Sequence, residues 1–291
     1  MKYSSLHTHT TFCDGQDDIE TYIRAAWEQG FHSIGFSTHA PVEKAGLCTG
    51  WHLKQARLEP CLDAVRAARR RWEGKIPVYL GLEIDWIQGR MGPADREYQA
   101  LGLDYIIGAV HYVLPPDNAP PIAVDSSPAE FEQDLKTHFN GDGEALAAAY
   151  WAAQTEMIQA GGFDILAHFD LVKKNNPGDR WFSTASGAES PYLRAACALI
   201  DPIARSGAVV EINTGGLNRG STTETYPSRY ILSLLHEKTV PVIITADAHN
   251  VTHLGGHYDT ARQTLQQAGY TKTVLFEGRR AGVPLWREDE L

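Results

Sequence analysis

The chain has 291 residues, 43% hydrophobic and 21% charged, a composition that is typical of a globular protein with a buried core and excludes a disordered chain. This length suits one large α/β unit, and we expect a single domain over residues 1–291. The formal net charge of −10 would repel a polyanion such as duplex DNA over most of the surface, so nucleic acid is not an expected partner.

The predicted strands are short apolar runs rich in β-branched residues, and they recur along the whole chain. In chain order they are Ser4–Thr8, Ser33–Ser37, Val78–Ile84, Tyr105–Tyr112, Ile165–His168, Val209–Asn213 and Val240–Ala246. Between them lie segments with helical periodicity, at Ile19–Gln29, His52–Trp72, Gly143–Ala160, Pro191–Arg205 and Tyr226–Glu237. Strands that alternate with helices pair in parallel through crossovers, and so many units without a break in composition favour closure into a barrel.

Two segments that follow predicted strands are expected to be long loops. Leu114–Pro128 is rich in Pro and Asp, and Lys173–Ser190 carries Asn, Gly and Ser. Such loops either contact the substrate or form inert surface, and the sequence leaves both roles open.

The cysteines and the first residues bear on the cellular compartment. The four cysteines are irregularly spaced and form no C-x-x-C pair, which predicts reduced thiols and argues against a zinc ribbon or a disulfide framework. The N-terminal sequence MKYSSLHTHTTF lacks the apolar run of a signal peptide, and no stretch of about eighteen apolar residues occurs. We therefore expect a cytoplasmic protein that does not bind a membrane.

Ionisable residues stand at the carboxyl ends of six of the seven predicted strands. They are His7 and His9, His39, Glu83 and Asp85, His111, His168, and Asp247 with His249. In a parallel barrel these ends converge on one face, so residues far apart in the sequence meet in one pocket. Core packing does not call for such residues, and burying them without partners is costly. The pattern therefore predicts a metal site at the carboxyl ends of the strands.

The residue types narrow the choice of metal. Imidazole nitrogens and carboxylate oxygens together suit Zn, Mn, Fe or Co. His7 and His9 are two residues apart, as are Asp247 and His249, and an extended chain turns both members of such a pair to the same side. These residues outnumber the ligands of one ion, which favours two or three divalent ions that share a bridging carboxylate. The other histidines lack this placement and are expected on the surface or in loops: His32, His52, His138, His236, His253 and His257.

Seven motifs occur in order along nearly the whole chain. They are LHTHTTFCDG at 6–15, FSTHAP at 36–41, GLEIDW at 81–86, GAVHY at 108–112, LAHFDL at 166–171, EINTGGLNRG at 211–220 and TADAHN at 245–250. This ordered set resembles the PHP (polymerase and histidinol phosphatase) superfamily and, within it, the stand-alone histidinol-phosphatases.

The resemblance implies a TIM-barrel-like, distorted (β/α)7 barrel with a trinuclear metal site. By position, one ion would be held by His7, His9, Glu83 and Asp247, a second by Asp14, His39 and His249, and a third by His111 and His168, with Glu83 as the bridge to it. Relatives can carry a histidine at the position of Asp14, so this residue is a departure within the second group.

The activity that the resemblance implies is the hydrolysis of L-histidinol phosphate to L-histidinol and phosphate, a step of histidine biosynthesis. Clustered ions would activate a water as the nucleophile and hold the phosphate in line. Asp247 and His249 are candidate catalytic residues, and either His249 or a metal-bound water would act as the general acid.

Residues outside the metal ligands are needed to recognise the substrate. Arg180, in the second long loop, and Arg219, in the EINTGGLNRG motif, are candidates to bind the phosphate through their guanidinium groups. Asp85 or Glu211 could bind the amine of the substrate.

Three alternatives stay open at this point. A phosphoesterase for nucleotides or nucleic-acid ends would use the same chemistry, and the absence of a basic stripe argues only against long polymers. Histidine-rich barrels also hydrolyse amides and lactones, but no lysine stands at a strand end to form the usual carbamylated bridge, and Glu83 occupies that position. A non-catalytic metal-binding barrel would be expected to have lost ligands, and none is lost. The oligomeric state is not predicted.

Overall fold

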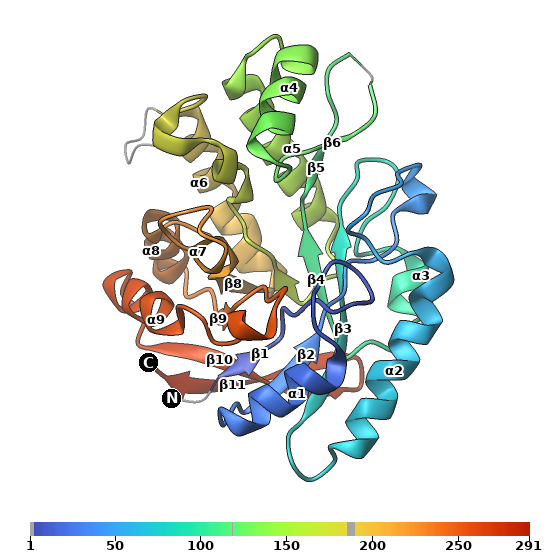
Figure 1. Ribbon diagram of the computed structural model, residues 1–291. Helices are drawn as coiled ribbons and strands as arrows, with labels where there is room; N and C mark the ends of the chain where they lie inside the picture. The colour runs from blue at the N-terminus through green and yellow to red at the C-terminus, as the bar shows by residue number, and fades with distance from the viewer. Residues whose placement is uncertain (1–2, 118, 185–189) are drawn as a thin grey trace.

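The computed structural model describes residues 3–117, 119–184 and 190–291. Seven parallel strands form a barrel in the order β1-β2-β3-β4-β7-β8-β9, with helices around it (Figure 1). The strands are β1 (Ser4–Ser5), β2 (Ser33–Phe36), β3 (Val78–Asp85), β4 (Tyr105–Ala109), β7 (Ile165–Leu166), β8 (Val209–Asn213) and β9 (Val242–Thr245). The predicted barrel and its seven strands are therefore confirmed, and most strands are shorter than predicted.

The barrel closes between β1 and β9. The His9 amide donates to the Ala248 carbonyl at 2.9 Å, and the Ala248 amide donates to the His7 carbonyl at 3.1 Å. The closing bonds therefore join the backbone of His7 and His9 to that of Ala248, which lies between Asp247 and His249. This pairing brings His7, His9, Asp247 and His249 to one end of the barrel.

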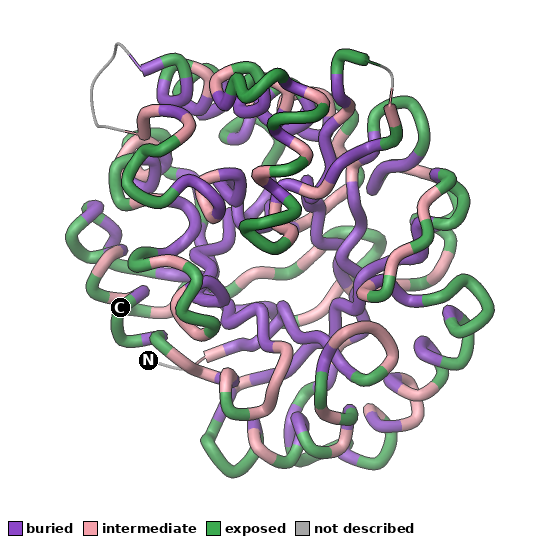
Figure 2. The backbone as a smooth tube through the Cα atoms, turned by 45° about the horizontal axis from the view of Figure 1, so that its top comes forward, coloured by how far each residue is buried: buried purple, intermediate pink, exposed green. Residues whose placement is uncertain are grey.

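Nine helices surround the strands within the described residues, and five of them were predicted, with differences mainly at their ends. They are α1 (Ile19–Glu28), α2 (Leu58–Arg71), α3 (Arg96–Gln99), α4 (Pro128–Phe139), α5 (Gly143–Ala160), α6 (Pro191–Ser206), α7 (Gly215–Asn218), α8 (Arg229–Glu237) and α9 (Tyr258–Gln267). Figure 2 shows buried residues along the central strands and exposed residues on the outer faces of these helices. The helix predicted over His52–Trp72 begins only at Leu58.

The first predicted loop, Leu114–Pro128, leads into helix α4, which the sequence analysis missed. Ser127 and Glu130 form a reciprocal capping box, in which the Glu130 amide donates to Ser127 Oγ at 3.3 Å and the Ser127 amide donates to Glu130 Oε2 at 3.1 Å. Two short antiparallel strands pair here, β5 (Tyr112–Val113) just before the predicted loop and β6 (Ile122–Ala123) within it. In Figure 1, α4, α5 and this pair lie beyond the carboxyl end of β4.

The second predicted loop, Lys173–Ser190, is irregular where the structure describes it. The short 3-10 turn Leu171–Asn175 begins two residues before this loop, and a second one, Pro177–Asp179, lies within it. Residues 185–189 lie outside the described part.

A C-terminal hairpin that was not predicted contributes to the interior of the barrel. Its strands are β10 (Lys272–Arg280) and β11 (Val283–Glu290). The Phe276 side chain is fully buried, with its ring centroid 5.6 Å from that of Tyr105 in the interior cluster. Large apolar side chains at one end of the barrel leave the other end free for polar groups.

Candidate metal centre

All nine predicted metal ligands meet at the carboxyl ends of the strands. Seven of them are buried, whereas the side chains of Asp14 and His249 are 28% and 19% exposed. Glu83 lies within β3, and the others follow β1, β2, β4, β7 and β9. The predicted convergence of strand ends is therefore confirmed as geometry, and the assignment of each residue to an ion stays a prediction.

Glu83 lies at the centre of the cluster. Its Oε2 is 2.8 Å from His39 Nδ1 and 3.2 Å from His7 Nε2. Its Oε1 faces a different pair, at 3.0 Å from His168 Nε2 and 3.6 Å from His111 Nε2. Two oxygens that face two groups of imidazoles suit a carboxylate that bridges ions.

A second part of the cluster lies nearer the solvent. His249 Nε2 is 3.1 Å from Asp14 Oδ2, and His9 Nε2 is 3.3 Å from Asp247 Oδ1. Donor atoms of His9, Asp14, His39 and His249 all lie within 4.8 Å of one another. Asp14 thus presents its carboxylate among three imidazoles.

Glu211, which had been considered for the amine of the substrate, is instead fully buried behind His7. Its Oε2 lies 2.8 Å from His7 Nδ1 and accepts the Thr245 hydroxyl at 2.8 Å, and its Oε1 accepts the His168 amide at 2.6 Å. A carboxylate behind an imidazole fixes the ring and its tautomer, which leaves His7 Nε2 to face the cluster. The amine role proposed for Glu211 is therefore wrong, because both oxygens are occupied inside the protein.

Asp85 and His52 were also placed incorrectly from the sequence. Asp85 is buried, with Oδ1 2.8 Å from His111 Nδ1 and Oδ2 2.9 Å from His52 Nε2. His52 was expected on the surface or in a loop, but it is only 4% exposed. Burial lowers the pKa of His111, but Asp85 and Glu83 outweigh burial and raise that pKa to about 10. Asp85 therefore serves the cluster and not a substrate amine.

Burial and the charges of neighbouring ligands strongly shift the pKa values within the cluster. Burial alone would raise the pKa of Glu83, but the neighbouring His39 and His7 hold it well below its usual range. Burial and the like charges of His249 and His39 lower the pKa of His9 to about 3. The lowered pKa values favour an ionised Glu83 and a neutral His9, which are the forms in which these two side chains bind a cation.

Buried polar atoms without a hydrogen bond indicate that the cluster suits metal ions. Among the described residues, six buried nitrogen or oxygen atoms of the predicted ligands have no hydrogen bond. One is His168 Nδ1, and the other five each lie within 4.0 Å of an atom of another ligand: His7 Nε2, His9 Nε2, Asp14 Oδ1, His39 Nδ1 and Glu83 Oε2. A buried polar atom without a partner costs about 1–3 kcal/mol, so five at one place call for a common partner. Nitrogen and oxygen donors in this mixture suit divalent transition-metal ions, and the residues fit the predicted cluster of two or three.

The two candidate arginines occupy different places. Arg219 lines the cavity above the cluster, and its Nη2 is 3.0 Å from Asp247 Oδ2. Arg180 is 3.1 Å from Glu132 and its guanidinium covers the Trp181 ring at 4.1 Å, in a neighbouring cavity that does not include the cluster. The structure thus brings Arg219 to the cluster and does not bring Arg180 there.

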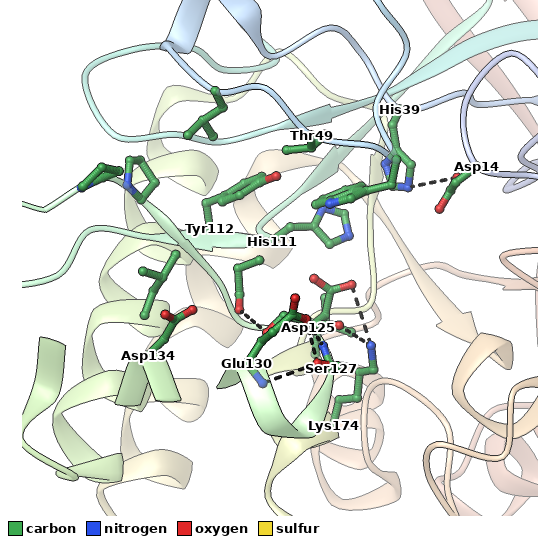
Figure 3. A pocket seen from close by; sticks show the side chains of 18 of the residues that line it. Asp14, His39, Thr49, His111, Tyr112, Asp125, Ser127, Glu130, Asp134 and Lys174 are labelled. Atoms are coloured by element: carbon green, nitrogen blue, oxygen red, sulfur yellow. Dashed lines mark hydrogen bonds and ion pairs between the residues drawn. The ribbon is translucent and has the colours of Figure 1, made fainter. Parts of the chain in front are cut away.

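The cavity above the cluster has a volume of about 860 Å³. Its cluster end is formed by Asp14, His39, His111 and Asp247, together with His168, Arg219 and His249. Its other end is formed by α4 and the loop before it, and carries Asp125, Glu130 and Asp134. Figure 3 shows Asp14 and His39 on one side of this cavity and Asp134 on the other. His138, expected on the surface, also lines the cavity and is paired with Asp117 at 2.8 Å.

Fold and site together define a metal-binding barrel whose polynuclear centre opens into a deep cavity. The family model of the PHP domain matches residues 5–215, and the chain belongs to this family. No helix within the described residues is long and apolar enough to cross a membrane. The cytoplasmic location stays a prediction.

Relatives with similar sequences match the chain over most of its length. A protein of Deinococcus radiodurans named "Probable histidinol-phosphatase" is 26% identical over 275 residues, which are 94% of this chain and 96% of that protein. The histidinol-phosphatase of Bacillus subtilis is 24% identical over 272 residues, which are 89% of this chain and 98% of that protein.

A solved structure shares the fold. The histidinol phosphate phosphatase of Lactococcus lactis, in complex with zinc, L-histidinol and phosphate, superposes with a TM-score of 0.71 at 18% identity. The superposition covers 96% of this chain and 99% of that one.

Proposed function

We propose that this chain is a metal-dependent phosphomonoesterase that hydrolyses L-histidinol phosphate to L-histidinol and phosphate. The observation that carries the proposal is a cavity with opposite electrostatic ends, in which a metal cluster and Arg219 face a group of carboxylates. A phosphate ester of an amino alcohol has matching ends, because its phosphate is anionic and its amine is cationic. The relatives named above act, by name, on this ester.

The nine predicted ligands would hold the ions, with Glu83 serving more than one of them. When bound, such ions withdraw charge from phosphoryl oxygens and lower the pKa of a coordinated water. Arg219 keeps Asp247 in place through two contacts, from Nη2 to Oδ2 at 3.0 Å and from Nη1 to the carbonyl oxygen at 3.2 Å. Its remaining N–H donors can bind a phosphate oxygen at the cluster end of the cavity.

His249 is the candidate to pass a proton to the departing alkoxide. Among the six histidines of the cluster it has the most exposed side chain, at 19%. Its Nδ1 lies 3.0 Å from the Asp247 carbonyl oxygen, so the ring is held at the cavity wall. Asp247 would act beside it by fixing this ring and by binding metal.

The acidic end of the cavity favours an amine over a nucleotide. Within the described residues, Asp134 has no hydrogen bond or ion pair, and burial together with Glu130 raises its pKa, against the opposing effect of His138. Lys174 is paired with Asp125 nearby, through its Nζ at 4.0 Å from Oδ2. A carboxylate whose pKa is raised gains from a cation, whereas a second phosphate or a nucleobase would leave it unpaired.

A phosphate-release screen tests the proposal directly. Metal-loaded protein should release phosphate from L-histidinol phosphate at least about tenfold faster, in kcat/KM, than from nucleoside monophosphates, a difference of about 1.4 kcal/mol. The screen compares Mn, Zn, Fe and Co, and chelation should abolish release with each. Equal rates on all esters would contradict the assigned substrate, and no release from any ester would contradict the phosphatase itself.

Changing Asp134 to Asn should separate recognition of the amine from hydrolysis. A hydrogen bond to a charged group is worth about 1.5–3 kcal/mol, so kcat/KM for histidinol phosphate should fall about tenfold or more. Phenyl phosphate, which has no amine, should be hydrolysed at an unchanged rate. Glu132→Gln on the same helix is the matched control, because Glu132 does not line this cavity. Equal losses on both esters would contradict a role of Asp134 in binding the amine.

A further inference from the structure

A buried chain of hydrogen bonds runs from a loop at the cavity to one predicted metal ligand. It begins at Thr49, whose Oγ1 is 2.7 Å from His52 Nδ1. His52 Nε2 is 2.9 Å from Asp85 Oδ2, and Asp85 Oδ1 is 2.8 Å from His111 Nδ1. The side chains of His52, Asp85 and His111 are each at most 4% exposed.

The chemistry of the groups sets the direction of these bonds. A carboxylate only accepts, so His52 Nε2 and His111 Nδ1 both donate to Asp85. His52 Nδ1 then accepts the Thr49 hydroxyl when the ring is neutral. The Nε2 of His111 faces Glu83 Oε1 at 3.6 Å, and in the neutral ring this is the nitrogen that is free of a proton, because Nδ1 donates to Asp85. The chain of bonds therefore presents His111 in the tautomer and orientation that bind a cation.

Neighbouring groups hold Asp85 and His52 in place. The backbone amide of His111 also donates to Asp85 Oδ1, at 3.2 Å. The Trp51 ring covers His52 with a centroid separation of 3.8 Å, and it lies 5.4 Å from the His111 ring. Since both carboxylate oxygens of Asp85 already accept N–H groups, the arrangement suits a residue that orients a ligand better than one that binds the ion itself.

We propose that His52 and Asp85 are positioning residues, which set the affinity of the cluster for the ion held by His111 and His168. The inference rests on the proposed metal role of His111 and is independent of which phosphate ester is hydrolysed. It gives a function to His52, which lies outside the motifs that carry the metal ligands.

Two substitutions of His52 test the proposal, because they differ in the nitrogen that they preserve. The amide of Gln reaches the position of Nε2, so His52→Gln can still donate to Asp85, whereas His52→Asn mimics only Nδ1. Substituting residues that orient a metal ligand typically lowers metal affinity about 10–100-fold. We expect this loss, for one ion only, in Asp85→Asn and in His52→Asn, and a loss below about threefold in His52→Gln.

The measurement is titration of the metal-free variants with zinc and with cobalt by calorimetry, together with the metal content after gel filtration and the cobalt absorption spectrum. No phosphate ester is present, so the result does not depend on the assigned substrate. Thr49→Val should also lower the affinity for this ion. Thermal unfolding of the metal-free proteins shows whether each variant is folded, and His32→Asn is the control because His32 is outside the cluster.

The double variant Asp85→Asn/His52→Asn tests whether His52 acts through Asp85 or independently of it. If His52 acts through Asp85, the double variant should bind the ion no more weakly than Asp85→Asn alone. If His52→Asn binds every ion with wild-type affinity, the proposed role of His52 is wrong. This holds even if Asp85→Asn loses the ion. Equal losses in His52→Asn and His52→Gln would also overturn it.

Discussion

Changing Glu83 to Gln should remove more than one equivalent of bound metal and lower kcat for phosphate release by at least about 10³-fold. The two oxygens of Glu83 face two groups of imidazoles, with Oε2 towards His39 and His7 and Oε1 towards His168 and His111. An amide keeps the shape of the side chain but has no charge and only one acceptor oxygen. Metal content after gel filtration and phosphate release are the two measurements.

Glu211→Gln is the matched comparison for this prediction. Glu211 is as deeply buried as Glu83, but it contacts the cluster only from behind, through His7 Nδ1 and the amide of His168. We expect a weaker affinity, by about 10–100-fold, without the loss of several ions. A loss of a single equivalent in Glu83→Gln, or the same metal content in both variants, would argue against a bridging role for Glu83.

The positions of the metal ligands could be predicted because they depend on local sequence. A strand end can be recognised from the apolar run before it, and parallel pairing then brings all such ends together. His168 follows Ile165–Leu166, and Asp247 follows Val242–Thr245, in this way. The ligands could be identified without interatomic distances, because the barrel brings residues that are far apart in the sequence next to one another.

The residues behind the ligands could not be predicted by this reasoning. Asp85 ends β3, so its sequence context is the same as that of a ligand, whereas Glu211 lies in the middle of β8. Only the structure shows that their oxygens face histidine N–H groups. His52 follows no strand, and its role depends on a loop that folds back onto Asp85. Tertiary contacts of this kind have no periodic signal in the sequence.

Helices α3, α4, α7 and α9 and the C-terminal hairpin were not predicted, and the sequence shows the reason for α4 and for the hairpin. Helix α4 carries a capping box at Ser127 and Glu130, which was a usable signal within the segment taken as a loop. The hairpin of β10 and β11 buries Phe276, but its strands are rich in charged residues because one face is exposed, which weakens the apolar pattern. Helix α4 supplies Asp134 and Glu130, so the missed helix hid the acidic end of the cavity.

Changing Arg219 to Met should lower kcat/KM for histidinol phosphate by about 10²–10³-fold, which corresponds to about 2.7–4 kcal/mol of transition-state stabilisation. Burial lowers the pKa of Arg219, but Asp247 outweighs burial and raises it, so the guanidinium is charged at the cluster end of the cavity. Its side chain is 31% exposed and can therefore bind a phosphate oxygen while it holds Asp247. Steady-state kinetics and metal content should be measured on the same preparations.

Arg180→Met is the control for this prediction. Arg180 is paired with Glu132 outside the cavity of the cluster, so its loss should change kcat/KM by less than about threefold. Arg219→Lys keeps the charge but not the paired donors, and it should recover only part of the activity. Metal content should stay at the wild-type level in Arg180→Met. In the two Arg219 variants it is measured beside the kinetics, because Arg219 also holds the predicted ligand Asp247 in place. Equal effects of Arg180→Met and Arg219→Met would contradict a specific role of Arg219 in phosphate binding.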